Sequence, residues 1–154
     1  MIHFELVTPE RVVFKQEIDA VTLPTSEGEI TVLPGHIPLV ASLTAGIARL
    51  KKGNVEEDVA VSGGFIEIQT GDMVRVLADT AERGIELDLK TIEEAKARAE
   101  KVMSETARTD DVGFAMAAAA LERELARYRV ARKHTGRTAP TIDRSSLPHD
   151  ENTI

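Results

Sequence analysis

The side chains that carry most protein chemistry are few in this chain, and their spacing assembles no recognisable reactive site. Metal sites and phosphate-binding loops each require a characteristic spacing of their ligands. The strings GxxxxGK[ST] and GxGxxG are both absent, and no cysteine is present to form a disulfide or a thiolate metal ligand. We therefore expect no metal site and no catalytic residue. The four histidines are too scattered to form a metal-ligand set: His3, His36, His134 and His149.

The remaining reactive candidates have simpler structural interpretations. Ser62 and His36 could belong to a Ser-His-Asp arrangement, but such residues can be selected from almost any chain of this length. Gly63 and Gly64 stand between two strand patterns, which favours a bulge or a close approach of strands. The adjacent carboxylates at 56–58 and 93–94 favour solvated faces. We expect the chain not to be an enzyme by itself; an enzyme built on Ser62 and His36 is the alternative.

Composition excludes several classes of partner. The 154 residues are 42% hydrophobic but only 3% aromatic, which argues against base-stacking nucleic-acid modules. Residues 1–84 carry 7 basic and 13 acidic side chains, so a phosphate backbone or an anionic lipid surface would be repelled. The longest uncharged apolar run, at 112–121, is much shorter than the roughly 20 residues that span a bilayer. We expect a soluble, cytoplasmic protein with no nucleic-acid partner.

The first half of the chain has the pattern of a β-sheet protein. Ile2, Phe4 and Leu6 alternate with polar residues, as in a half-buried strand. Turn signals such as Thr8-Pro9 and Pro34-Gly35 separate the apolar segments that follow. About nine short strands in this half indicate a sandwich or flattened barrel. The further segments are 12–14, 18–23, 29–33, 39–43, 46–50, 55–61, 65–68 and 73–77.

After Gly84 the apolar period changes to that of a helix. Asp88 is a candidate N-cap for a first helix, with Thr91 and Glu94 as an alternative capping box, and Asp110 can cap a second helix that runs to about His134. A short connection between them predicts an antiparallel hairpin. We predict an α+β chain with a β domain at 1–84, a helical hairpin domain at 85–134 and a flexible polar tail at 135–154. The two apolar stripes are Leu89, Ile92, Ala95, Ala99, Val102 and Met103, then Phe114, Ala118, Leu121, Leu125 and Tyr128.

Three separate blocks of sequence resemble one family, the epsilon subunit of the F-type rotary ATP synthase. They are SEGEITVLPGHIPLVASLTAG from Ser26, VSGGFIEIQTGDMVRVLADTAER from Val61 and AAAALERELARYRVARK from Ala117. The resemblance covers about residues 1–134, with the blocks in the family's order. Thr31 stands where the family commonly has glycine, and the tail after His134 is longer than is typical.

The resemblance implies a central-stalk rotor subunit that binds the gamma subunit and the c-ring and helps couple proton-driven rotation to ATP synthesis. Such a subunit lies peripherally at the cytoplasmic face of the bacterial inner membrane and reaches the membrane only through the complex. In the family the acidic turn and the Pro-Gly-His corner face the c-ring. This implies an interface at Glu27, Glu29, Gly35 and His36, whereas the residues alone indicate turns and solvated side chains. A small β-sandwich binding module with a helical oligomerisation tail is the alternative function.

The helical hairpin suggests regulation. Its seam is rich in alanine, which keeps each helix helical but buries little apolar area, so the hairpin could separate at modest cost. The family uses such a hairpin to inhibit ATP hydrolysis, which implies transient contact with the catalytic alpha and beta subunits. The basic face implied for this contact is Arg123, Arg127, Arg129, Arg132 and Lys133; solvated cations near a helix C-terminus are the alternative.

Some bacterial members bind regulatory ATP through the string I-D-x-x-R-A. The matching string here is LDLKTI, in which Asp88 is kept but Thr91 and Ile92 replace the arginine and the alanine. Loss of a charge-assisted phosphate contact weakens such a site. We therefore expect no cofactor, with a weak nucleotide site at Asp88, Arg98, Arg123 and Arg127 as the alternative.

Overall fold

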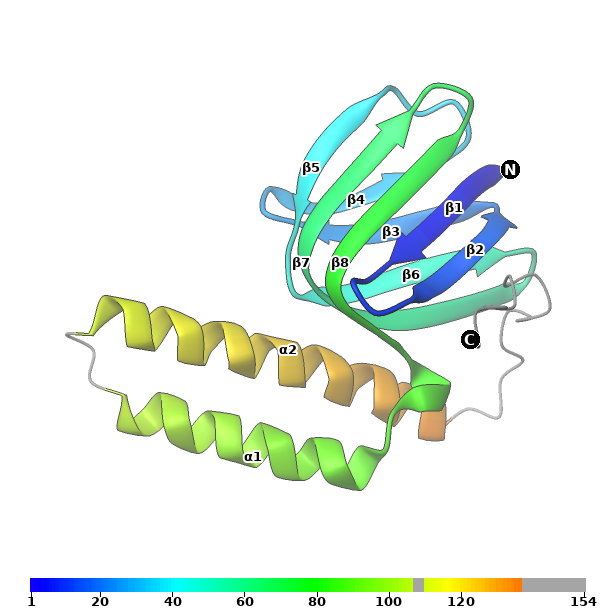
Figure 1. Ribbon diagram of the computed structural model, residues 1–154. Coiled ribbons are helices and arrows are strands. Elements are labelled where there is room, and N and C mark those ends of the chain that lie inside the picture. The colour runs from blue at the N-terminus through cyan, green and yellow to red at the C-terminus, as the bar shows by residue number, and fades with distance from the viewer. Residues whose placement is uncertain (107–109, 137–154) are drawn as a thin grey trace, which may run out of the picture.

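The computed structural model describes residues 1–106 and 110–136, and it confirms the predicted order of a β-sandwich followed by two helices (Figure 1). A short 3-10 helix, η1, joins the two parts. Most of the tail predicted from residue 135, including His149, lies outside the described residues. The strands are β1 (Ile2–Val7), β2 (Val12–Ile18), β3 (Ala20–Thr25), β4 (Gly28–Val32), β5 (Leu39–Leu43), β6 (Gly46–Lys52), β7 (Val55–Gln69) and β8 (Met73–Arg83). The helices are η1 (Gly84–Glu86), α1 (Leu89–Glu105) and α2 (Asp111–Thr135).

The strands form one continuous hydrogen-bonded sheet in the order β2-β1-β8-β7-β5-β3-β4, with β6 bridging β3 and β7. Only the pair β1–β8 is parallel among the strand pairs of the described residues. The first part of β7 pairs with β6, and its last part pairs with β5. Since β7 is shared in this way, it connects the two layers of the sandwich (Figure 1).

Alternating side chains from both layers fill a single core. Ile2, Phe4 and Leu6 are at most 1% exposed, as the period-two pattern of the first strand predicts. The core continues through buried aliphatic side chains on every strand from β1 to β8. Removal of this apolar area from water is the main term that stabilises the sandwich.

The Gly63-Gly64 step lies within one long strand, so the prediction of about nine short strands is wrong: the described residues form eight. Gly63 and Gly64 have φ angles of 48° and 126°. The β7–β8 register is the same on both sides of them, with Ser62 opposite Thr80 and Gly64 opposite Ala78, so no residue is inserted. A Cβ atom on Gly64 would collide with the backbone carbonyl oxygen of Leu77. The glycines therefore allow the close strand approach that the sequence indicated.

The two helices begin at the predicted caps. The carboxylate of Asp88 accepts the Lys90 N–H at 3.2 Å and the Thr91 hydroxyl at 2.7 Å, so Asp88 rather than the Thr91 alternative caps α1. The carboxylate of Asp110 accepts the Gly113 N–H at 3.0 Å at the start of α2. Helix α2 ends at Thr135, one residue beyond the predicted end. The helices form an antiparallel hairpin in which α2 lies between α1 and the sandwich (Figure 1).

Helix α2 has two contact stripes, of which the sequence revealed one. The predicted seam includes Tyr128, whose ring lies 4.7 Å from the Lys96 ammonium of α1. On α1, Ile92 is buried, but Val102 of the predicted stripe remains 53% exposed. The second contact stripe faces the sandwich, where Ala126 and Val130 pack with Ala60 of β7. Such small side chains give only a weak hydrophobic signal in the sequence. The buried residues of α2 as a whole are Ala117, Glu124, Ala126, Val130 and Ala131.

Candidate functional site

The Pro-Gly-His corner between β4 and β5 is fixed to another turn of the sandwich. The Gly35 N–H donates to Asp72 Oδ1 at 2.6 Å, and Asp72 itself adopts a positive φ of 59° in the β7–β8 turn. The His36 N–H donates to the Leu33 carbonyl at 3.1 Å, which closes the corner. Gly35, with a φ of 83°, supplies a left-handed conformation that other residues rarely adopt. The corner is therefore a defined protrusion, tipped by exposed Leu33 and Ile37.

The two glutamates of the acidic turn are also exposed, but they do not cluster with His36. Glu27 lies in the β3–β4 turn, where its N–H donates to the Thr25 hydroxyl at 3.2 Å. Glu29 lies on β4, which is an edge strand. The five residues of β4 span about 17 Å between the acidic turn and the Pro-Gly-His corner. The four predicted residues therefore form an elongated edge rather than a compact site.

The outer face of the sheet carries an apolar row beside a charged hollow. Phe65 of β7 and Leu77 of β8 are direct cross-strand neighbours, and they are 60% and 50% exposed. Val40 of β5, which is 70% exposed, lies opposite the residue Glu67 on the neighbouring strand. Exposed large apolar side chains that neighbour one another on a sheet indicate a contact surface. The sequence alone does not reveal this surface, because the same residues also fit the alternating pattern of a strand.

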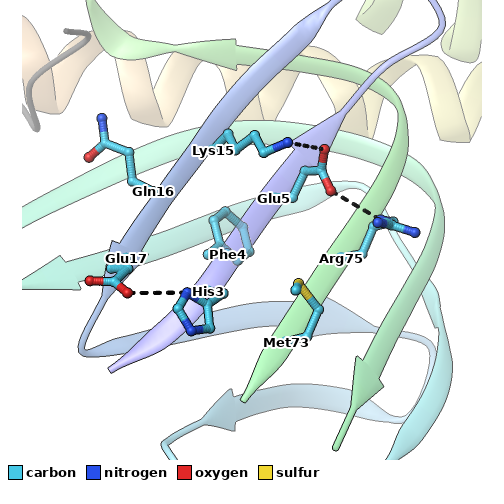
Figure 2. Close-up of a pocket in the computed structure, with 8 residues that line it drawn as sticks. All are labelled: His3, Phe4, Glu5, Lys15, Gln16, Glu17, Met73 and Arg75. Atoms are coloured by element: carbon cyan, nitrogen blue, oxygen red, sulfur yellow. Dashed lines mark hydrogen bonds and ion pairs between the residues drawn. The ribbon is translucent and has the colours of Figure 1, made fainter. Parts of the chain in front are cut away.

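The neighbouring hollow has a volume of about 310 Å³ and is lined by charged side chains from β1, β2 and β8 (Figure 2). Glu5 lies between two cations: its carboxylate is 3.1 Å from Arg75 Nε and 3.8 Å from Lys15 Nζ. His3 lies 3.2 Å from Glu17 on the adjacent strand. These charges neutralise one another, so the hollow presents a paired charged ladder rather than an activated nucleophile or base.

The basic residues of α2 do not share one face. Arg127 donates to Glu82 of β8 and also to Glu124 of its own helix at 2.9 Å. Burial acts to lower the pKa of Arg127, but the hydrogen bonds and charges of the two carboxylates outweigh it and raise that pKa. Lys133 Nζ lies 2.6 Å from Asp58 Oδ2 of β7. In this conformation the sandwich holds two of the cations of the predicted basic face, Arg127 and Lys133. The other three residues of that predicted face are Arg123, Arg129 and Arg132.

The link between the sandwich and the helices is held by arginine–glutamate pairs. Arg83 at the end of β8 binds Glu57 inside the sandwich, and the Arg83 N–H donates to Glu86 Oε2 at 2.9 Å. Arg11, next to the β1–β2 turn, forms a two-pronged pair with Glu86 at 2.6 and 2.9 Å. The hydrogen bond that Arg11 donates to the Glu86 carboxylate, opposed by burial, raises the pKa of Arg11. These contacts fix the direction in which the chain leaves the sheet.

The other predicted chemical residues are used within the fold. Asp88 is occupied as the cap of α1, and Arg127 by Glu82 and Glu124, while Arg98 and Arg123 stand on exposed helix surface. Ser62 exchanges a hydrogen bond with Thr80, its cross-strand neighbour. Ser62 lies in the middle of β7, whereas His36 lies beyond its C-terminal end, beside the turn of Asp72, so the structure does not bring Ser62 and His36 together.

Residues 1–106 and 110–136 hold neither a candidate metal site nor a candidate membrane helix. No group of three or more histidine, aspartate or glutamate side chains is arranged to hold a metal ion. In the same residues, no helix has both the length and the apolar composition needed to cross a bilayer.

Residues 1–84 match the family model of the ATP synthase delta/epsilon chain β-sandwich domain, and residues 86–132 match the model of its long α-helix domain. The ATP synthase epsilon chain of Halalkalibacterium halodurans is 43% identical over 130 residues, which cover 84% of this chain and 96% of the relative. The epsilon chain of Alkalihalophilus pseudofirmus is 48% identical over 113 residues, which cover 73% of this chain and 84% of that relative.

Solved structures show the same fold. A chain of the Euglena gracilis mitochondrial ATP synthase, from a structure of its OSCP/F1/c-ring assembly, superposes with a TM-score of 0.70 at 24% identity. The superposition covers 88% of this chain and 81% of that chain. The fold comparison agrees with both sequence comparisons, and the resemblance stated from the three sequence blocks is confirmed: the chain belongs to the ATP synthase delta/epsilon chain family.

Proposed function

We propose that this chain is a central-stalk rotor subunit of an F-type ATP synthase, which couples proton-driven rotation of a c-ring to ATP synthesis and catalyses no reaction itself. The observation that carries the proposal is the match to an epsilon chain over 96% of that relative's length, with both family domains in the same order. The subunit would lie peripherally at the cytoplasmic face of the bacterial inner membrane, attached through gamma and the c-ring.

The c-ring contact is proposed to be the elongated edge formed by Glu27, Glu29, Gly35 and His36. Both carboxylates are exposed, and the Pro-Gly-His corner is held in place by the 2.6 Å hydrogen bond from Gly35 to Asp72. A preformed protrusion loses little conformational entropy on binding. The competing explanation for Glu29 is that a charge on an edge strand prevents unwanted strand pairing.

The gamma subunit is proposed to bind the outer sheet face at Val40, Phe65 and Leu77. Stable interfaces bury roughly 800 Å² on each partner and have an apolar centre with a polar rim. The row of Phe65 and Leu77 supplies such a centre, and the paired charges of Glu5 and Arg75 lie beside it.

The hairpin at 85–134 is proposed to be a second, movable domain hinged on the 1–84 sandwich near η1. Its contact with the sandwich uses small side chains, such as Ala126 against Ala60, so little apolar area is lost when it detaches. Detachment would release Arg127 and Lys133 to join the exposed cations of α2. This basic helix could then reach the catalytic alpha and beta subunits and inhibit ATP hydrolysis.

Capture of the gamma subunit tests the proposed function. The purified full chain should bind immobilised gamma as a single copy, and Phe65→Glu should weaken that binding at least tenfold, because it places a charge at the centre of the apolar row. The matched control is Val102→Glu, which changes an exposed apolar residue on α1. A chain that ignores gamma and purifies as a stable homo-oligomer would instead support the oligomeric binding module.

A further inference from the structure

The contact between Asp58 and Lys133 has an unusual feature. The Asp58 side chain, on β7, is 7% exposed, and its Oδ2 atom receives the Lys133 ammonium at 2.6 Å. Its other oxygen, Oδ1, is buried and has no hydrogen-bond partner in the part of the chain that the structure describes. A buried carboxylate oxygen without a partner raises the free energy of the conformation that buries it. Lys133, at 39% exposed, can return to water with little rearrangement.

A second cation lies close to the same carboxylate. Arg49 on β6 is the direct cross-strand neighbour of Asp58, and its Nε atom lies 4.0 Å from Asp58 Oδ1. This distance is too long for a hydrogen bond but short enough for a small shift of the half-exposed Arg49 side chain to make one. The sheet therefore holds an alternative partner for Asp58 that does not belong to the helices.

The pair occupies the end of α2 that is attached to the sandwich. Arg127, Val130 and Lys133 all contact the sheet, and a Cβ atom on Gly84 would lie 2.9 Å from His134 Cβ. At the opposite end of α2, Met116 is 70% exposed and borders an open hollow that Thr44 and Asp79 of the sandwich also line. Movement of the hairpin away from the sheet therefore requires the contacts of Arg127, Val130 and Lys133 to be released.

We infer that Asp58 is the switch point of the hairpin. Its carboxylate binds Lys133 when the helices are folded down, and it pairs with Arg49 instead when they detach. The transfer means that opening does not leave a bare buried charge, which is the main cost of breaking a buried ion pair. The inference rests on the proposed regulatory function and names the residues that set the equilibrium between the two hairpin states. That equilibrium can be measured in the isolated chain, without the rest of the complex.

The test measures the hairpin position in the isolated full chain. Since the chain has no cysteine, spin labels can be placed at Asn54→Cys in the β6–β7 turn and Lys101→Cys on α1, both of which are exposed. Lys133→Glu should raise the ratio of the long-distance to the short-distance population at least about fivefold. The combined exchange Asp58→Lys with Lys133→Asp should return that ratio to within about twofold of the starting chain. Arg49→Met should lower it, because the alternative partner is lost.

Arg132→Glu is the matched control, because it makes the same change of charge at the neighbouring exposed position. An equal effect of Arg132→Glu and Lys133→Glu, or failure of the exchanged pair to restore the distance, would overturn the inference. Lys133→Gln with a circular dichroism spectrum covers the case in which the charge reversal unfolds α2. If the labels respond as expected but ATP hydrolysis by the assembled complex does not change, the regulatory function fails and the switch point stands.

Discussion

Arg83 and Glu57 face each other inside the sandwich through two parallel hydrogen bonds, Nε to Oε1 at 2.5 Å and Nη2 to Oε2 at 2.9 Å. Their side chains are 2% and 6% exposed, and the Arg83 guanidinium also lies 4.4 Å from the centre of the Phe14 ring. The pair joins the end of β8, where the chain leaves the sheet, to the middle of the fold. The two buried charges thus neutralise each other.

Removal of one partner should therefore be costly. Glu57→Ala removes the buried carboxylate that accepts two hydrogen bonds from the Arg83 guanidinium, and we expect a loss of about 3–5 kcal/mol in the free energy of unfolding, measured by urea denaturation. Lys101→Ala, which breaks the exposed pair of Lys101 and Glu105 on α1, should cost less than about 0.5 kcal/mol. Equal losses in the two variants would contradict the role given to the buried pair.

Gly64 should not tolerate a side chain. Gly64→Ala places a Cβ atom against the Leu77 carbonyl oxygen at a positive φ of 126°, and we expect a loss of about 2–4 kcal/mol in stability. Gly71→Ala is the control: its φ of 81° is also positive, but the space around it is open, so only about 1 kcal/mol should be lost. Thermal unfolding of each variant measures its loss of stability. The loss in Gly71→Ala gives the cost of backbone strain, and the additional loss in Gly64→Ala gives the cost of the collision.

The attachment of α2 through Arg127 should not respond to pH in the neutral and mildly alkaline range. The pKa of Arg127 is raised in the folded chain, so its stabilisation is complete below the unfolded pKa and is lost only as the pH rises through the still higher folded value. Arg127→Lys should keep the hairpin folded down at neutral pH but release it near about pH 11, because a lysine titrates near 10.4. The spin-label distance is measured at both pH values in a Lys133→Arg background, so that the second cation that holds α2 to the sandwich is also a guanidinium. Identical alkaline behaviour of the chains with arginine and with lysine at position 127 would refute the prediction.

Charge reversal on the edge strand should weaken the proposed c-ring contact. Glu29→Lys leaves the β4 backbone pairing intact, because the Glu29 side chain is exposed, but it inverts the charge presented to the ring. We expect at least about tenfold weaker recovery of the chain with detergent-solubilised c-ring and gamma. Glu10→Lys, an exposed reversal in the β1–β2 turn, serves as the control. Unchanged recovery of the Glu29 variant would remove Glu29 from the interface.

Deletion of the hairpin should raise ATP hydrolysis by the assembled complex while assembly is kept. The structure indicates where to cut: ending the chain after Ala81 would remove Arg83 and with it the buried pair of Arg83 and Glu57, whereas ending it after Leu87 keeps Arg83 and Glu86. The chain ending at Leu87 should bind gamma normally and relieve inhibition. No increase in hydrolysis with normal assembly would show that the hairpin is not inhibitory.

The sequence predicted the parts of the fold that leave a local signal. Alternation at Ile2, Phe4 and Leu6 located a strand, and carboxylates at Asp88 and Asp110 located both helix starts. The predicted number of strands was wrong, because two adjacent glycines such as Gly63 and Gly64 usually indicate the end of a strand. The sequence does not show that β8 stays paired with β7 on both sides of them. The apolar row at Phe65 and Leu77 could not be predicted either, since alternation alone does not say which face is covered.

The candidate site was predicted in composition but not in arrangement. The three sequence blocks identified the acidic turn and the Pro-Gly-His corner, but the five-residue length of β4 separates them into an extended edge. The charge of α2 was evident, yet the capture of Arg127 and Lys133 by Glu82 and Asp58 depends on residues 45 and 75 positions away. Such long-range pairs come from the packing of α2 on the sheet and leave no pattern in the chain.

The unbroken register of β7 and β8 across Gly63 and Gly64 has a mechanical consequence. One end of this two-stranded ladder is tied to the Pro-Gly-His corner through Asp72, and the other continues directly into Arg83 and the hinge. A twisting force applied at the corner would therefore travel along cross-strand hydrogen bonds that are loaded together, with no soft linker to absorb it. The strand pair would therefore transmit torque from the corner to Arg83 as one stiff unit.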